Sequence, residues 1–452
     1  MTRAYFGTDG IRGTANRHPM TAEVALRVGM AAGRRFIRGS HRHRVVIGKD
    51  TRLSGYLLEP ALTAGFVAVG MDVTLAGPLP TPAVAMLTRS LRADLGVVIS
   101  ASHNPYQDNG IKLFGGDGYK LPDKVEAEIE RWMADDAAIA DAVATGEGIG
   151  RAYRIEDSRG RYVVYLKTTF PNDLTLDGVK IAVDCANGAG YKVAPAVFEE
   201  LGATVVARGI SPNGLNINEG CGALHPDKLA RLVLEEGCDI GVALDGDADR
   251  CILVDELGEV VDGDQILALC ATRLSRTGAL ARNALVVTVM SNYGLEMAMR
   301  DHGIRLVRTD VGDRYVVEAM RKGGYSLGGE QSGHIVNFDH GTTGDGVQSA
   351  LQVLAVMQRE QTPLSELRKV MSPAPQTLIN VMVSSKPSLS TLSTVAREIV
   401  RAEKSLEGTG RVLVRYSGTE KKCRVMVEGQ DEAAVHEHAS RIAEAISEAI
   451  GV

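Results

Sequence analysis

Hydrophobic and polar positions follow a repeated order along the chain: a short β-branched run, a small polar turn, and then a helical pattern. This order occurs in RVVIGKDTRLSG near Val45, in KIAVDCANGAG near Ile181 and in ALVVTVMSNYG near Val286. Apolar strands that alternate with helices are typical of mostly parallel sheets with helices on both faces. We therefore predict three related α/β domains with mixed sheets, whose functional loops gather at the strand ends.

The pattern changes after Pro375, where short strands such as NVMVS, VLVRYS and CRVMVEG flank a helix near 392–403 and precede an amphipathic helix at 432–450. This part is predicted to be a smaller C-terminal α+β domain. An acidic, Ala-rich stretch and a Pro-containing segment indicate connectors between domains. The predicted domains are 1–153, 154–256, 257–370 and 371–452.

Composition narrows the possible classes of protein. A chain of 452 residues needs several hydrophobic cores, and a formal charge of -6 lacks the basic excess of a nonspecific nucleic-acid binder. The six cysteines form no CxxC pair, and no apolar run approaches the ~18 residues that span a bilayer. We expect a soluble cytoplasmic protein with reduced thiols, no nucleic-acid partner and no membrane partner.

The first candidate loop is VVISASHNPYQDNGIKLF, in which an apolar strand leads to Ser102 and His103. We expect Ser102 to be exposed at the strand end, although on this segment alone an ordinary turn serine fits as well. Lys112 lies between two apolar residues, so partial burial is expected to lower its pKa and make it a proton-transfer group. A Ser-His-acid hydrolase fits poorly, because no GxSxG motif surrounds the serine.

The second loop is DIGVALDGDADRCILVDE, where Asp245, Asp247 and Asp249 alternate between two apolar strands. Carboxylates this close repel one another unless a cation joins them, and an all-oxygen ligand set favours Mg²⁺ or Ca²⁺. An EF-hand is the rival reading, with Glu256 at its twelfth position. Arg250 opposes it by occupying the sixth position, where a glycine is needed. A solvated acidic loop is the remaining alternative.

The third loop, LGGEQSGHIVNFDHGTTGDG, carries Glu330, Ser332 and His334 at alternate positions. In an extended backbone these side chains face one way. A carboxylate, a hydroxyl and an imidazole on one face suit the hydroxyl groups of a sugar, whereas the alternative is a polar strand edge.

The fourth loop, VLVRYSGTEKKCRVMVEG, is predicted to be a strand, a turn and a second strand that bring Arg415 and Arg424 together. The turn of Ser417, Gly418 and Thr419 offers hydroxyls and backbone N–H groups. With two guanidinium groups it predicts a nest for a phosphate dianion, and a plain hairpin with surface arginines stays open as the alternative.

Taken in this order, SASHNP, DGDADR, GEQSGH and RYSGTE resemble the signatures of the α-D-phosphohexomutase family over nearly the whole chain. The resemblance implies four domains around a central cleft, each contributing one loop. Many relatives have Pro after SGTE, where this chain has Lys421. The resemblance implies that Ser102 is the phosphoserine and that it binds Mg²⁺ together with Asp245, Asp247 and Asp249. It implies that the transfer site contains Arg12, His103 and Lys112, and that the sugar is bound by Glu330, Ser332 and His334. It also implies that the phosphate is bound by Arg415, Ser417, Gly418, Thr419 and Arg424.

Within the family, Gln331 and the segments FGTDGIRG, VMSNYG and VGDRYV are most similar to bacterial members that act on amino-sugar phosphates. The resemblance implies an isomerase that interconverts glucosamine 6-phosphate and glucosamine 1-phosphate through a phosphoserine and glucosamine 1,6-bisphosphate. Its product would feed UDP-N-acetylglucosamine and cell-wall precursor synthesis. Activation by the bisphosphorylated sugar, by autophosphorylation or by a kinase is expected, and a homodimer is left open.

Two alternatives to that activity stand beside it. A phosphomannomutase or phosphoglucomutase shares the chemistry but acts on neutral hexose phosphates. A catalytically silent protein that binds sugar phosphates is the other alternative, and the intact Ser102 and aspartate trio oppose it.

Overall fold

The computed structural model describes residues 4–417 and 421–452. Gly418 and Thr419 of the predicted phosphate-binding turn therefore lie outside the described residues. None of the helices in this part of the chain combines the length and the apolar composition that crossing a bilayer requires.

The chain forms two compact units, which we describe separately. The first unit contains Met1–Met290 and Ile304–Lys369, and the second contains Ser291–Gly303 and Val370–Val452.

The N-terminal part of the first unit is built on a mixed sheet with the strand order β1-β2-β6-β5-β3-β4-β7. Strand β3 pairs in parallel with β4 and β5, and β6 joins β5 in the antiparallel direction. The mixed sheet agrees with the prediction. The strands are β1 (Phe6–Gly7), β2 (Gly10–Thr14), β3 (Arg44–Lys49), β4 (Asp72–Pro78), β5 (Leu95–Ile99), β6 (Asp108–Gly115) and β7 (Ala152–Arg154).

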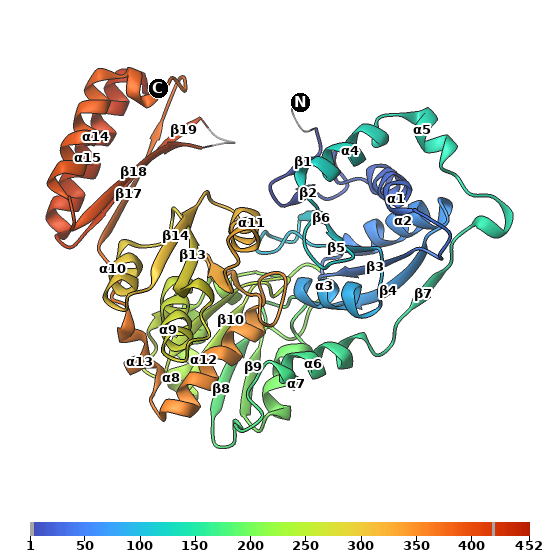
Figure 1. The fold of residues 1–452 in the computed structure, drawn as a ribbon, viewed down its shortest axis with the longest axis horizontal. Coiled ribbons are helices and arrows are strands. Elements are labelled where there is room, and N and C mark those ends of the chain that lie inside the picture. Colours follow the sequence, from blue (N-terminus) through green and yellow to red (C-terminus); the bar gives the residue numbers. More distant parts are fainter. Residues whose placement is uncertain (1–3, 418–420) are drawn as a thin grey trace. The chain divides into compact units, whose positions relative to one another are not determined.

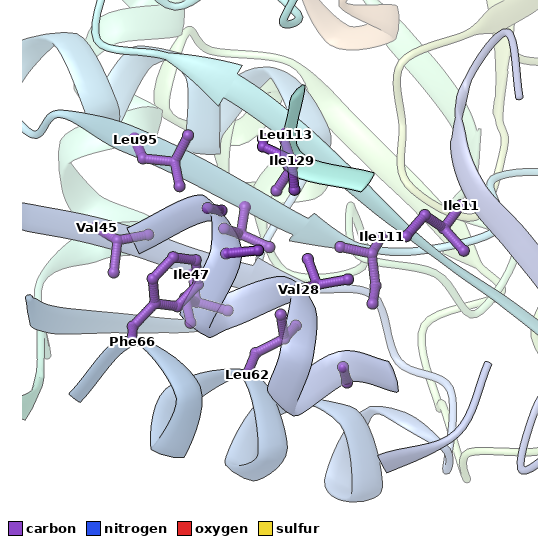
Figure 2. Close-up of a cluster of buried hydrophobic side chains, with 14 of the residues drawn as sticks. Ile11, Val28, Val45, Ile47, Leu62, Phe66, Leu95, Ile111, Leu113 and Ile129 are labelled. Carbon is purple, nitrogen blue, oxygen red and sulfur yellow. The ribbon is translucent and has the colours of Figure 1, made fainter. Parts of the chain in front are cut away.

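Helices cover both faces of this sheet, as the continuous apolar strands predict. Alternate strand residues such as Val45 and Ile47 pack against Val28 and Phe66 of two helices on one face (Figure 2). On the other face, α3 packs against β3 and β5. The helices of this part are α1 (Ala22–Phe36), α2 (Gly55–Ala68), α3 (Thr81–Ser90), α4 (Asp123–Met133) and α5 (Asp136–Asp141).

The second sheet has the order β12-β11-β10-β8-β9, with β8 parallel to β9 and β10, and β11 antiparallel to β10. Every residue of β10 and β11 is buried. Leu229 and Val233 of α8 belong to the apolar cluster on one side. The elements are α6 (Ser158–Thr168), β8 (Lys180–Asp184), α7 (Val193–Glu200), β9 (Thr204–Arg208), α8 (Asp227–Glu236), β10 (Ile240–Leu244), β11 (Cys251–Asp255) and β12 (Val260–Val261).

The third sheet has the order β14-β13-β15-β16. A capping box between Asp262 and Gln265 begins helix α9. Asp345 caps helix α12 and also accepts a 2.5 Å hydrogen bond from the Tyr162 hydroxyl, which ties this part to α6. The elements are α9 (Gly263–Arg276), β13 (Ala284–Thr288), β14 (Arg305–Thr309), α11 (Asp313–Gly323), β15 (Leu327–Gly329), β16 (Ile335–Asn337), α12 (Gly346–Glu360) and α13 (Leu364–Leu367).

The second unit contains an antiparallel sheet of order β17-β19-β18, and its two long helices lie side by side along the sheet (Figure 1). The predicted amphipathic helix at 432–450 is confirmed as α15. The elements are β17 (Gln376–Met382), α14 (Ser393–Ser405), β18 (Gly410–Tyr416), β19 (Lys422–Gly429) and α15 (Glu432–Ile450).

Helix α10 (Tyr293–Asp301) belongs to this second unit, although in sequence it lies within the predicted domain 257–370. The fully buried carboxylate of Glu428 holds it there, because it accepts hydrogen bonds from the Tyr293 backbone N–H at 3.1 Å and from Arg411 Nε at 2.6 Å. The predicted boundaries near 153, 256 and 370 stay predictions.

The crossing of α1 and α2 gives a prediction about stability. An added Cβ at Gly65 would lie 2.3 Å from the Leu26 carbonyl oxygen and 3.0 Å from the Gly29 Cα, both of them backbone atoms. We expect Gly65→Ala to lower the free energy of unfolding by about 1–3 kcal/mol, because the helices must move apart. Urea denaturation measures the change.

The matched control is Gly160→Ala in α6, where an added Cβ meets nothing within 4 Å. Alanine favours a helix over glycine, so this variant should gain about 0.5 kcal/mol. Equal urea midpoints for the two variants would contradict the close helix crossing.

Candidate active site

Four loops and the N-terminal segment of the first unit meet at a pocket of about 400 Å³. The loops follow strands of the three sheets, as expected for sites at strand ends. Residues from all five segments line the pocket, among them Asp9, Arg12, Ser102, His103, Asp249, Arg250, Asp313, Glu330 and His334.

Ser102 is held rigidly in the loop that follows β5. Its φ of 52° lies in the left-handed region, which costs a non-glycine residue about 1–3 kcal/mol unless its surroundings enforce it. Here the Arg52 guanidinium and the Asn218 amide donate to the Ser102 carbonyl oxygen at 2.9 and 2.8 Å. The Ser102 N–H donates to Ser100 Oγ at 2.9 Å. The predicted exposure is wrong: Ser102 is only 1% exposed, because neighbouring segments enclose it.

The Ser102 hydroxyl points toward the aspartate loop. Its Oγ donates to Asp245 Oδ2 at 2.5 Å and lies 3.3 Å from His103 Nδ1. Burial, together with the positive charges of Arg250 and Arg12, lowers the pKa of His103 to about 4. The imidazole is therefore neutral near pH 7, and in this environment it is a weaker base than a free histidine.

Asp245, Asp247 and Asp249 form a compact group between β10 and β11, and one oxygen from each lies within 4.8 Å of the other two. All three are buried, and in the described part of the chain Asp247 Oδ1 and Asp249 Oδ1 have no hydrogen-bond partner. Burial and the two neighbouring carboxylates raise the pKa of Asp245 well above its usual value. Buried carboxylate oxygens without a donor fit a hard divalent cation.

The EF-hand alternative is excluded by the flanking elements, which are antiparallel strands rather than helices. Glu256, its twelfth position, instead accepts a hydrogen bond from the Ser365 N–H at 3.2 Å.

Lys112 lies on β6 and is 1% exposed. Its Nζ donates to Asp247 Oδ2 at 2.9 Å and lies 3.6 Å from Asp249 Oδ2. Burial disfavours the ammonium, but the carboxylates of Asp247, Asp9 and Asp249 outweigh that effect and raise the pKa of Lys112. The predicted lowering is wrong, and the raised pKa keeps the side chain positively charged near pH 7.

The sugar loop is a tight hairpin turn between β15 and β16, not the extended segment that we predict from the sequence. The Glu330 N–H donates to the His334 carbonyl and the Gly333 N–H to the Glu330 carbonyl, both at 3.0 Å. Consequently Glu330 and His334 are buried at the pocket while Ser332 is exposed. Ser332 Oγ lies 3.4 Å from Glu330 Oε2, so its hydroxyl still reaches that carboxylate.

Asp9 and Asp313 line the pocket but received no role from the sequence. Both follow a small turn residue within segments that the sequence analysis singled out, FGTDGIRG and VGDRYV. Arg12 Nη2 donates to Asp9 Oδ2, and its Nη1 approaches the Ala101 carbonyl at 3.5 Å. For Asp9, the available signal was the predicted Arg12 three residues later.

The phosphate loop belongs to the second unit. Arg415 and Arg424 are directly opposite each other on β18 and β19, so the sequence prediction that they come together is confirmed. Burial and then the charge of Arg424 lower the pKa of Arg415. The Ser417 N–H donates to the Lys422 carbonyl at 2.9 Å. Two guanidinium groups held side by side favour an anion between or beside them.

Comparison with known protein families gives matches along the whole chain. Models of the phosphoglucomutase/phosphomannomutase family match it in four parts, described as α/β/α domains I, II and III and a C-terminal domain. They match residues 3–139, 161–258, 262–374 and 378–445, respectively.

Curated relatives match over nearly their full lengths. A phosphoglucosamine mutase of Geobacter sp. (strain M21) is 58% identical over 446 residues, which cover 99% of this chain and 98% of the relative. A phosphoglucosamine mutase of Myxococcus xanthus (strain DK1622) is 57% identical over 447 residues, covering 99% and 97%.

Solved structures share the fold. A phosphoglucomutase/phosphomannomutase family protein of Burkholderia thailandensis has a TM-score of 0.80 at 24% identity, covering 98% of this chain and 99% of its own. An N-acetylphosphoglucosamine mutase of Aspergillus fumigatus, solved in complex with GlcNAc-6P and magnesium, has a TM-score of 0.67 at 19% identity, covering 100% and 96%.

The carboxylate trio gives a prediction about metal binding. Asp249→Asn removes one ligand charge and spares the Asp247 contact with Lys112, so Mg²⁺ affinity should fall on the order of 10-fold or more. Isothermal titration calorimetry with Mg²⁺ measures the change. The control is Asp173→Asn, which alters an exposed carboxylate paired with Arg359. Equal Mg²⁺ affinities for the two variants would contradict the assigned metal site.

Proposed function

Since the chain belongs to the phosphoglucomutase/phosphomannomutase family, we propose that it is a phosphotransferase isomerase that interconverts glucosamine 6-phosphate and glucosamine 1-phosphate. The observation that carries this proposal is the 2.5 Å hydrogen bond between the Ser102 hydroxyl and Asp245. It joins a buried nucleophile to a carboxylate trio at a pocket that the sugar loop also lines. The near-complete match to phosphoglucosamine mutases supports the choice of sugar.

Asp245, Asp247 and Asp249, with a Ser102 oxygen as fourth ligand, would hold Mg²⁺. When bound, this ion supplies positive charge that offsets the negative charge on a phosphoryl group. Lys112 and Arg12 supply further charge from the protein. Because the phosphoryl transition state is loose, positioning and positive charge account for most of its stabilisation.

The reaction begins with a phosphoryl group on Ser102. The sugar's 1-hydroxyl oxygen attacks this phosphorus, its bond to phosphorus forms, and the Ser102 Oγ–P bond breaks, which gives glucosamine 1,6-bisphosphate. The hydroxyl's proton would pass through His103, 3.3 Å from the serine oxygen, to the leaving Ser102 oxygen, and the negative charge of the phosphoryl group would raise the pKa of this imidazole. The intermediate then turns over, the Ser102 oxygen attacks the 6-phosphorus while the sugar's O6–P bond breaks, and the proton ends on the sugar's 6-oxygen.

The two halves of the reaction require two opposite sugar orientations. Glu330 and His334, buried at the pocket, would bind sugar hydroxyls, and Ser332 would join them from the turn. Arg415, Ser417 and Arg424, with Gly418 and Thr419, would bind the phosphate that does not react. If water discharges the phosphoserine, a bisphosphorylated sugar, autophosphorylation or a kinase would restore it.

The sugar assignment rests on the relatives rather than on Gln331, the residue that seemed to distinguish the sugars in the sequence. Gln331 Nε2 donates to Asp262 Oδ2 at 3.1 Å, at the start of α9, which is a structural contact. Turnover of glucosamine 6-phosphate should exceed that of mannose and glucose phosphates when the coupled formation of each 1-phosphate is measured. A large preference for a neutral sugar would overturn the assignment.

The phosphoserine is tested with Ser102→Ala. Turnover should fall about 10³-fold or more, because the covalent acceptor is lost, and glucose 1,6-bisphosphate should no longer add a phosphoryl mass to the intact protein. The control is Ser90→Ala at the exposed end of α3. Full turnover by Ser102→Ala would favour a different nucleophile, and absence of turnover in the unaltered protein would favour a silent binding protein.

A further inference from the structure

A row of alternating charges crosses the first unit between the aspartate trio and the sugar loop. Lys112 Nζ, beside Asp247, lies 3.4 Å from Asp9 Oδ2. Asp9 Oδ1 contacts Lys120 Nζ, and the same ammonium contacts Asp313 Oδ2. Lys120 is thus a shared counter-charge between Asp9 of the N-terminal segment and Asp313 of the third α/β part.

The backbone fixes Lys120 at this place. Its segment folds back on β6, since the Gly115 N–H donates to the Tyr119 carbonyl at 2.8 Å and the Leu121 N–H to the Leu113 carbonyl at 3.0 Å. The strand that carries Lys112 therefore also anchors Lys120. The Thr342 hydroxyl donates to the Gly118 carbonyl at 2.7 Å and fastens the same turn to the third α/β part.

The two carboxylate oxygens of Asp9 have different partners. Oδ1 faces Lys120, while Oδ2 accepts from Arg12 and lies near Lys112. Without Lys120, Asp9 and Asp313 would be two carboxylates with no cation between them and would repel each other. Asp9 would then turn further toward Arg12 and Lys112, and both cations would move from the places that the Ala101 carbonyl and Asp247 now share with Asp9.

We propose that Lys120 is a positioning residue for phosphoryl transfer: through Asp9 it keeps Arg12 in place beside the Ser102 loop and Lys112 in place beside the aspartate trio. Through Asp313 it also links that arrangement to the sugar loop, where the Gly312 N–H donates to Glu330 Oε1 at 3.0 Å. This inference rests on the proposed phosphoryl-transfer function. It assigns no direct contact with the substrate to Lys120.

The test compares Lys120→Met with Lys124→Met, which removes an exposed lysine from the first turn of α4. The measured quantity is the rate at which glucose 1,6-bisphosphate phosphorylates Ser102, followed by intact-protein mass. We expect Lys120→Met to slow this rate about 10- to 100-fold and Lys124→Met to leave it unchanged, because small displacements of transfer groups have effects of this size. Lys120→Arg should recover most of the rate, since a guanidinium can also join two carboxylates.

A double-variant comparison separates positioning from a general loss of structure. If Lys120 acts through Asp9, then Asp9→Asn and Asp9→Asn/Lys120→Met should phosphorylate Ser102 at equal rates, and Lys120→Met should lower kcat far more than it changes KM. Equal rates for Lys120→Met and Lys124→Met, or additive losses in the double variant, would overturn the proposal. A failure of the proposed sugar specificity would instead appear in the unaltered protein's turnover of glucosamine 6-phosphate.

Discussion

Three carboxylates are buried in one short loop, and the rest of the first unit must supply charges and hydrogen-bond donors that make this burial possible. Asp245, Asp247 and Asp249 repel one another, and away from water that repulsion grows as the effective dielectric constant falls. Arg250 offsets part of this repulsion from within the loop, and the rest of the protein's own compensation comes from outside it: Lys112 from β6, and Thr81 at the start of α3, whose hydroxyl donates to Asp247 Oδ2 at 2.6 Å. The first two α/β parts must therefore dock for the loop to be stable, and the same docking brings Ser102 to Asp245.

This dependence explains what the sequence could and could not reveal. Repeated strand-turn-helix patterns were sufficient to predict mixed α/β sheets, and the apolar strands around the aspartates correctly placed that trio in a loop. The pairing of Arg415 with Arg424 was equally accessible, because a hairpin is a local structure whose register follows from the turn. Features governed by residues near one another in the chain were predictable.

The errors concern properties that distant segments control. The exposure of Ser102 was inferred from its neighbours in sequence. Arg52 and Asn218, which lie far from it in the chain, donate to its carbonyl oxygen and help to bury it. A lowered pKa of Lys112 was inferred from its apolar neighbours, whereas the carboxylates of Asp9 and Asp247 raise that pKa. The alternation along GEQSGH was interpreted as a strand. Gly333, with a φ of 88°, instead permits the turn that separates Ser332 from Glu330 and His334.

Because α10 belongs to it, the second unit is built from two separate stretches of the chain. Its sheet and two long helices come from the last part of the sequence, after Val370. Helix α10 begins nearly eighty residues earlier, and the Glu428 carboxylate accepts a hydrogen bond from the first residue of that helix. The polypeptide consequently passes between the units three times, at 290/291, 303/304 and 369/370. A recombination event with one crossover near residue 370 would separate Glu428 from its native α10 partner, so modular exchange of this unit between relatives requires both pieces to travel together.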